Sequence, residues 1–241
     1  MIARSSEPGS LTGAIYLRIR HDILTGALRP GQKLRIEGLC ARYDVGSSPI
    51  REALSRLSAE QIVVQSDRRG FHAAPVSTDE LEELTRTRCW VNEITMREAI
   101  AHGDEAWEER IVIALHRLER MPTGEVAGSD ADSQEREERH REFHAALIAS
   151  CPSTPLLDFS QALFDRADRY RSLTRRRSPA QPRDTRSEHR AIMDATIARD
   201  TPTAIRLLNE HATRTATDVS VIAAVLRATN APGDNKLTTR H

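Results

Sequence analysis

Four of the nine histidines occupy the apolar phase of the helices that their surroundings predict. His140 and His144 are four residues apart and share one helix face, while His189 and His211 lie on two later segments. A single histidine in such a position is ordinarily a hydrogen-bonded core residue. Burying several imidazoles without partners is unfavourable, whereas one divalent ion bound by their ring nitrogens satisfies all of them. The four residues therefore predict a metal site within a helical core.

Ligands that are all imidazole nitrogens fit zinc, nickel or copper, and of these we expect zinc, with nickel as the second candidate. The segment from His140 to His144 is not an H-E-x-x-H motif, because Arg141 occupies the position of the catalytic glutamate. The chain also lacks a G-x-S-x-G nucleophile elbow and a phosphate-binding glycine loop. A metal without a general base favours sensing over turnover, so the sequence predicts a protein that is not an enzyme.

Arg88 places a permanent cation on the inward stripe of its predicted helix, since it follows Leu84 by four residues and precedes Val91 by three. Such an arginine either pairs within the protein or is available to an anion, and the residues alone leave both interpretations open. Tyr170 and Arg171 are further pocket candidates, for which packing or a surface role is the alternative.

Residues 47–57 predict a helix that contacts DNA. Its buried face repeats at helical spacing and consists of Ile50, Ala53, Leu54 and Leu57. Ser48 is expected as the N-cap, and Pro49 suits the first helical position, where no backbone N–H is needed. The opposite face presents hydroxyl and guanidinium groups, which suit phosphate oxygens and base edges: Ser47, Ser48, Arg51, Ser55 and Arg56.

The elements around this helix predict a winged helix-turn-helix domain over residues 11–75. Helices are expected at residues 12–26, 36–44 and 47–57, followed by a β-hairpin of residues 62–65 and 71–74. The tip of the hairpin is basic and ends in Arg69-Gly70. Three helices followed by a hairpin are the pattern of this domain.

Residues 76–229 predict an all-α bundle that contains the four histidines. Its helices are expected at residues 78–101, 104–121, 132–150, 154–176, 184–199 and 202–228, with loops at 122–131 and 177–183. Residues 1–10 are expected to be flexible and residues 230–241 to be disordered. The predicted fold is therefore mostly α, with an N-terminal winged helix-turn-helix and a C-terminal helical bundle.

Composition is consistent with this division. Residues 1–75 hold 11 Arg or Lys against 7 Asp or Glu, although the whole chain has no formal net charge, which fits a nucleic-acid-binding head on an acidic body. Aromatic residues make up only 4% of the chain, which argues against a stacking platform for single strands. Three cysteines without C-x-x-C spacing predict neither disulfides nor a cysteine metal site. With no apolar signal or membrane-spanning run, we expect a cytoplasmic protein.

Three stretches of the first domain carry a family pattern: Ile23-Leu24-Thr25-Gly26-Ala27-Leu28-Arg29-Pro30-Gly31, Pro49-Ile50-Arg51-Glu52-Ala53-Leu54, and Arg69-Gly70. They resemble bacterial GntR-family transcription regulators of the FadR subfamily. The second part resembles the helical FCD effector domain through Phe143-His144, Glu188-His189 and His211. It resembles in particular the subgroup of the carbon-starvation-induced, glutarate-responsive repressor, through Trp107-Glu108, Arg139-His140-x-x-Phe143-His144 and Arg169-Tyr170-Arg171.

The resemblance implies a homodimeric, ligand-responsive regulator, expected to be a repressor, that binds a pseudo-palindromic operator in double-stranded DNA. The residues expected at the DNA are Arg35, Ser47, Ser48, Arg51, Arg69 and Gly70. In FCD domains, residues matching the four histidines hold zinc, nickel or a similar ion, and the arginine matching Arg88 helps to bind a carboxylate. By this resemblance a small organic acid is expected at Arg88, Asn92, Tyr170 and Arg171.

Three positions depart from the family pattern. Many members begin the recognition helix with Ser-Arg-Thr-Pro, whereas this chain has Gly46-Ser47-Ser48-Pro49, so its operator should differ. The FCD pattern has Asp where His140 stands, and ligation by histidines alone leaves the site more positive and more attractive to anions. Asn92 stands where many relatives have Glu, which leaves the local partner of Arg88 open.

Two other functions fit the same residues. One is a metal-dependent hydrolase fused to a DNA-binding head, and the other is a constitutive DNA-binding dimer whose histidines hold a structural metal. The effector is equally open: a dicarboxylate such as glutarate follows only from the subgroup resemblance, and an aromatic acid is equally compatible with the residues.

Overall fold

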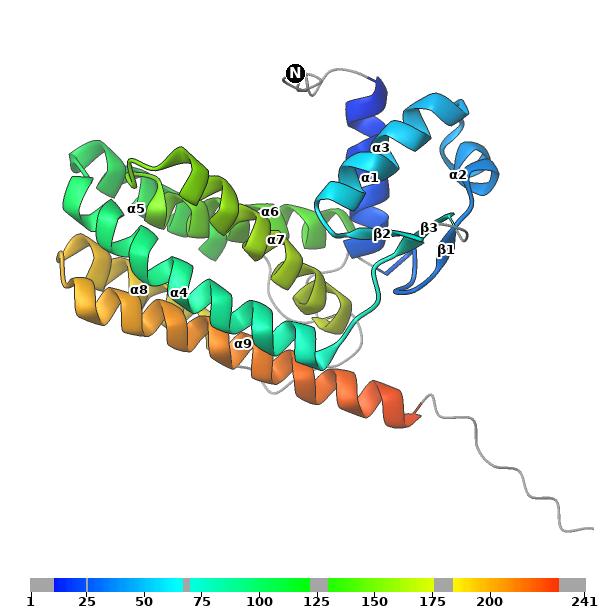
Figure 1. Cartoon of the computed structure of the whole chain (residues 1–241). Helices are drawn as coiled ribbons and strands as arrows, with labels where there is room; N and C mark the ends of the chain where they lie inside the picture. The colour runs from blue at the N-terminus through cyan, green and yellow to red at the C-terminus, as the bar shows by residue number, and fades with distance from the viewer. Residues whose placement is uncertain (1–10, 25, 67–69, 122–129, 176–183, 230–241) are drawn as a thin grey trace, which may run out of the picture.

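The computed structural model describes residues 11–24, 26–66, 70–121, 130–175 and 184–229. Figure 1 shows a small N-terminal head of helices and short strands beside a bundle of longer helices, joined by an extended segment after the last strand. The expectations for residues 1–10, the wing tip with Arg69, the loop centres at 122–129 and 176–183, and the tail at 230–241 lie outside the described residues.

The head contains the three helices and the hairpin that the sequence predicts, and one strand more. The elements are α1 (Leu11–Leu24), β1 (Lys33–Leu34), α2 (Ile36–Tyr43), α3 (Ser47–Ala59), β2 (Val63–Ser66) and β3 (Gly70–Ala73). β1 adds to the hairpin and gives an antiparallel sheet of order β1-β3-β2. A strand of two residues is too short to show the alternation of apolar and polar residues that identifies a strand in a sequence. Only its pairing with β3 defines it. Helix α1 ends before Gly26, whose φ of 77° is left-handed.

Helix α3 begins at Ser47, as the range 47–57 predicts, but its N-cap lies two residues before the expected Ser48, so that N-cap prediction is wrong. Gly46 is the N-cap, with an extended backbone and no side-chain cap. Ser47 and Ser48 are therefore helical residues and expose their hydroxyls. Pro49 remains within the first turn, where backbone N–H groups have no partner in the helix. The buried face of α3 is the predicted one, because Ile50, Leu54 and Leu57 are fully enclosed.

The bundle contains the six helices that the sequence predicts, with ends that differ by at most two residues. They are α4 (Thr78–His102), α5 (Glu105–Glu119), α6 (Asp130–Ile148), α7 (Thr154–Arg175), α8 (Thr185–Ile197) and α9 (Thr201–Thr229). Side chains cap three of them: Ser77, Asp104 and Asp184 accept hydrogen bonds from the backbone N–H of Glu80, Trp107 and Ser187.

Packing in the bundle brings α4 and α9 side by side, with α7 against both of them and also against α1 of the head (Figure 1). The main core surrounds Trp107, Phe143 and Leu147, all fully buried. No helix within the described ranges is both long and apolar enough to cross a membrane.

Candidate metal centre and adjoining pocket

Three helices bring the four predicted histidines together. α6 supplies His140 and His144, α8 supplies His189 and α9 supplies His211. Each is at most 9% exposed, and one nitrogen from each ring lies within 4.8 Å of one from every other ring. The histidines that the sequence singled out by helical phase thus converge in space, although His140 and His211 are 71 positions apart in the chain.

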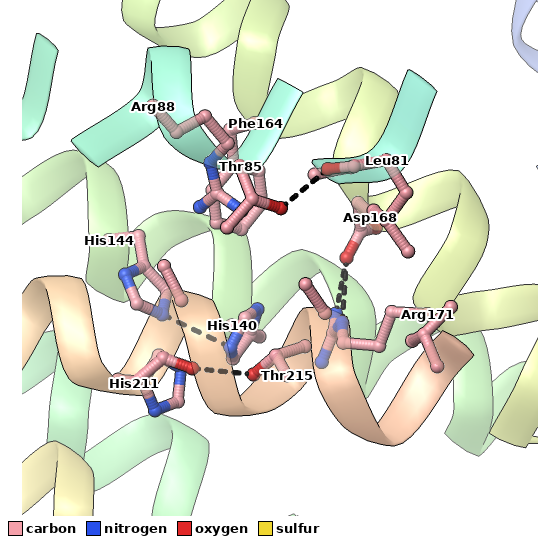
Figure 2. A pocket seen from close by; sticks show the side chains of 14 residues that line it. Leu81, Thr85, Arg88, His140, His144, Phe164, Asp168, Arg171, His211 and Thr215 are labelled. Atoms are coloured by element: carbon pink, nitrogen blue, oxygen red, sulfur yellow. Dashed lines mark hydrogen bonds and ion pairs between the residues drawn. The ribbon is translucent and has the colours of Figure 1, made fainter. Parts of the chain in front are cut away.

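The hydrogen bonds of the cluster leave several ring nitrogens available. The Nε2 atoms of His140 and His144 lie 3.1 Å apart, at the distance of one shared proton (Figure 2). Nδ1 of His140 and Nε2 of His189 are buried without a hydrogen-bond partner among the described residues. Two buried ring nitrogens without hydrogen bonds destabilise the fold unless a bound ion or water molecule interacts with them.

Glu188 is a residue of this site that the sequence analysis assigned no role. Its Oε2 lies 2.8 Å from Nδ1 of His211, which favours the tautomer with a proton on Nδ1 and a lone pair on Nε2. A carboxylate in this position also fixes the ring orientation of a metal-binding histidine. The Glu188-His189 pair marks the residue in the sequence, but its contact with His211 crosses from α8 to α9.

The surroundings keep three of the four imidazoles neutral. Burial, reinforced by the charge of Arg171, holds the pKa of His140 well below its usual range. Burial and the neighbouring histidines do the same to His144, and burial is the main cause that lowers the pKa of His189 to about 2. Because a metal binds the neutral ring through its lone pair, these residues are in the required form at neutral pH. The donor set, its convergence and the two orphaned nitrogens fit a divalent ion such as zinc.

A small pocket adjoins the cluster. Its volume is about 30 Å³, and His140, His144 and His211 form one side of it. Figure 2 shows Arg88 of α4 on the other side, next to Phe164. The Arg88 guanidinium makes no hydrogen bond or ion pair with any described residue and lies 5.1 Å from the Phe164 ring centroid. Burial lowers the pKa of Arg88 to about 10, although the nearby charge of Asp168 favours the cation, so the pocket holds a guanidinium that contacts no carboxylate of the described residues.

Arg171 also lines the pocket, but its charge is already neutralised. Its guanidinium pairs with Asp168, with Nε 2.9 Å from Oδ1, and with Glu137. The side chain of Asp168 is only 3% exposed. Burial disfavours the charge of Arg171, but these two carboxylates outweigh it and hold its pKa above the usual range. A ligand that contacts Arg171 must therefore compete with the carboxylates of Asp168 and Glu137 for its N–H groups.

The structure places the two other predicted effector residues outside the pocket. Asn92 donates to the side chain of Asn209, 3.2 Å away, between α4 and α9. The hydroxyl of Tyr170 donates to Glu80 at 2.6 Å and lies 3.4 Å from the backbone N–H of Ser77. Tyr170 and Arg171 are consecutive on α7 and point about 100° apart around the helix, so only one of them reaches the pocket.

Five of the six predicted DNA-contacting residues belong to the described ranges, and these five lie on the surface of the head. Arg35 precedes α2, and Ser47, Ser48 and Arg51 are exposed along the first turns of α3. Gly70 begins β3 with a left-handed φ of 76°. Arg56 differs from the prediction, because it is half-buried with its guanidinium 4.2 Å from the Tyr16 ring centroid on α1.

A winged helix-turn-helix followed by a helical domain with a buried histidine cluster defines a class of ligand-sensing transcription regulators. Residues 11–72 match the family of bacterial regulatory proteins called gntR, and residues 83–214 match the FCD domain. The chain therefore belongs to the GntR family and carries an FCD domain, as its motifs predict.

Relatives and solved structures agree with this assignment. The chain is 36% identical to an uncharacterized HTH-type transcriptional regulator, BphR of Paraburkholderia xenovorans, over 84% of this chain and 82% of that one. It is 34% identical to the HTH-type transcriptional repressor GlaR of Escherichia coli, over 81% and 90% of the two chains. The fold is similar to that of E. coli McbR/YncC, with a TM-score of 0.71, 19% identity, and coverage of 90% and 99%.

These families and relatives are transcriptional regulators and not enzymes. The chain is accordingly a transcriptional regulator of the GntR/FCD type, and the prediction that it is not an enzyme is confirmed. Regulators of this kind bind operator DNA and respond to small-molecule effectors.

Proposed function

We propose that the protein is a homodimeric repressor that holds zinc at its four clustered histidines and releases its operator when a small organic acid binds beside the metal. The carrying observation is Arg88, a guanidinium without a protein anion that shares a pocket with His140, His144 and His211. Zinc, when bound, would supply a positive centre for a carboxylate oxygen. Arg88 would pair with the same ligand, and the absence of an aspartate among the histidines strengthens the attraction for an anion.

Repression would follow from the geometry of the head. Each chain has one recognition helix, α3, with Arg51 and the hydroxyls of Ser47 and Ser48 on its exposed side. Two such helices in a homodimer would read two half-sites of a pseudo-palindromic operator in successive major grooves. Arg35 would contact phosphates, and the wing residues Arg69 and Gly70 would reach the adjacent groove.

The metal is tested first, by elemental analysis of tag-free protein. We expect about one zinc per chain, with nickel as the alternative ion, and its loss in His144→Ala and His189→Ala. Glu188→Gln should keep the site but weaken zinc binding by about ten-fold or more, because His211 loses the carboxylate that orients it. Glu210→Gln on α9 is the matched control, since its partners are Arg206 and Arg214.

The effector is tested by thermal shift of the zinc-loaded protein against small acids that include glutarate and an aromatic acid. An acid present at 100 times its Kd should stabilise the protein by about 2.7 kcal/mol. Arg88→Gln should abolish this stabilisation, while Arg86→Gln, an exposed arginine on the same helix, should retain it. Bound zinc with no response to any acid would instead favour a constitutive DNA-binding dimer with a structural metal. If the protein bound no zinc and no acid stabilised it, the four histidines would be buried polar residues with only a structural role.

A further inference from the structure

Helix α7 contacts both the pocket and the DNA-binding head. Phe164, Asp168 and Arg171 line the pocket, while Asp165 and Arg169 point toward the head. The guanidinium of Arg169 donates to the carbonyl oxygens of Ala74 and Pro75, at 3.1 and 2.9 Å, and so holds the segment that joins the two domains. Less than two helical turns of α7 thus connect the two functional parts of the chain.

Asp165 uses one carboxylate oxygen within the helical domain and the other across the boundary to the head. Oδ1 lies 3.1 Å from Nη2 of Arg141, the residue that follows His140 on α6. Oδ2 lies 2.9 Å from Nη2 of Arg20 on α1, an ion pair by distance although the N–H is not aimed at the oxygen. The side chain of Arg20 is only 10% exposed, so water replaces this partner poorly.

Arg20 in turn reaches the end of the recognition helix. Its Nε lies 3.6 Å from Oε2 of Glu60, the C-cap residue of α3, and Tyr16 donates to Oε1 of the same carboxylate at 2.7 Å. Burial opposes the charge of Arg20, but the carboxylates of Asp165 and Glu60 outweigh it and hold the pKa of Arg20 above its usual range. One arginine therefore connects Asp165 to the element that reads DNA.

Occupation of the pocket must displace part of its lining, which comes from α4, α6, α7 and α9. A cavity of about 30 Å³ is too small for an organic acid, so an acid enters only if lining side chains or helices move. A metal that draws His140 toward the other ring nitrogens also moves its neighbour Arg141. Two of the helices that line the pocket are α6 and α7, and Asp165 of α7 joins them through its contact with Arg141 of α6.

We propose that Asp165 is the positioning residue that couples the histidine pocket to the recognition helix, through Arg141 on one side and through Arg20 and Glu60 on the other. The coupling to ligands rests on the function proposed above. The contact between the two domains is independent of it. With Asp165 bound to both arginines, the orientation of the head follows the pocket. Without Asp165, the head stays attached through Arg169 but no longer responds.

The first test uses the full-length, metal-free protein and hydrogen exchange. Asp165→Asn keeps the shape of the side chain and removes its charge. Amides in residues 16–23 of α1 and 56–62 at the end of α3 should exchange about five-fold faster or more, because local opening becomes easier. Asp158→Asn, at an exposed position on the same helix, is the control and should match the wild type. Equal exchange in the two variants would overturn the proposal.

The second test adds zinc as the only probe. In the wild type, zinc should change exchange both near the histidines and at residues 56–62. In Asp165→Asn, zinc should bind with unchanged stoichiometry, and its effect should stay within the helical domain. A zinc response at residues 56–62 that survives this substitution, or that is missing from the zinc-bound wild type, would refute the coupling. If the wild type binds no zinc, the function proposed above fails, while the metal-free comparison still decides the positioning role.

Arg141→Gln tests the contact of Asp165 with α6 separately from its contact with Arg20. It also replaces Asp165→Asn as the test variant if far-UV circular dichroism shows that Asp165→Asn folds poorly. This substitution keeps the contact between Arg20 and Asp165 but cuts the connection to α6. Metal-free exchange at residues 56–62 should then remain near that of the wild type, and the zinc response there should fall. An undiminished zinc response would contradict the proposed route.

Discussion

At the scale of single residues, burial determines the charge of the titratable side chains in the site. Burial holds the pKa values of His140, His144 and His189 below the usual range, that of His189 at about 2, and leaves Arg88 as a cation in contact with no carboxylate of the described residues. Asp168 and Glu137 neutralise Arg171 in the same pocket. The pocket therefore contains one unpaired positive group beside nitrogen lone pairs, an arrangement that suits a metal and an anion.

The neutral histidines make the stability of the metal-free protein depend on pH. Their pKa values are lower in the folded than in the unfolded chain, so unfolding takes up protons below the unfolded value of about 6.5. The contribution of these histidines to the free energy of unfolding is thus largest above a pH of about 6.5, and it decreases as the pH falls below that value. Between about pH 7.5 and about pH 5.5 we expect a loss of about 1.4 kcal/mol for each imidazole that stays neutral.

Urea unfolding at the two pH values measures this loss. The candidates are His140, His144 and His189, and His189→Gln should show a smaller decrease than the wild type because one proton-binding group is removed. The exposed His116 on α5 provides the control, since His116→Gln should leave the pH dependence unchanged. Stability that is constant over this interval would mean that the imidazoles are not held neutral in the folded state.

At the scale of elements, the junction between α4 and α5 sets the bundle geometry near the core. Gly103 is the C-cap of α4, and Asp104 caps α5 directly after it. Arg199, with a left-handed φ of 57°, donates to the carbonyl oxygens of Ile100 and Gly103 and so satisfies the end of α4. The ring of Trp107 lies against the Gly103 backbone, which leaves no room for a side chain.

Gly103→Ala should destabilise the helical domain by about 1–3 kcal/mol, because an added Cβ would lie 2.0 Å from Cε3 of the fully buried Trp107. Thermal or urea unfolding measures the change. Gly38→Ala in α2 is the matched control, since the nearest atom to its Cβ would be 4.0 Å away. In the control, an alanine inside a helix should be neutral or stabilising by about 0.5–1 kcal/mol. Equal effects of the two substitutions would show that Trp107 can move aside.

At the scale of the whole molecule, the head is docked on the bundle by polar contacts between α1 and α7. Arg20 pairs with Asp165, and Arg169 holds the connecting segment. The exposed face of α3 lies away from these contacts, because Arg51 is exposed while Arg20 is buried. The predicted DNA-contacting residue Arg51 and the interdomain contact of Arg20 thus occupy different surfaces of the head.

Arg51→Ala should weaken binding to a DNA site selected by the wild-type protein by about 1–3 kcal/mol, equivalent to about five- to 150-fold, because it removes a guanidinium from the recognition helix. Fluorescence anisotropy at several salt concentrations measures both the affinity and the salt slope. Arg110→Ala removes an exposed arginine of α5 and should bind as the wild type does. If Arg51→Ala bound DNA with full affinity, the proposed position of α3 in the major groove would be wrong.

The sequence by itself determined the helices, the histidine cluster and the family. Helical period and capping are local properties, so each long helix could be predicted to within a few residues, and a shared apolar phase identified His140, His144, His189 and His211. The motifs of the first domain were sufficient for the assignment to the GntR family.

Only the tertiary structure decided which polar groups meet across helices. The contact of Glu188 with His211, the two partners of Asp165, and the positions of Asn92 and Tyr170 outside the pocket depend on how helices rotate and pack. Strand β1 likewise exists only through its pairing with β3. Local periodicity fixes the face of a helix on which a residue lies, but the partner on that face is set by long-range packing, which no local pattern encodes.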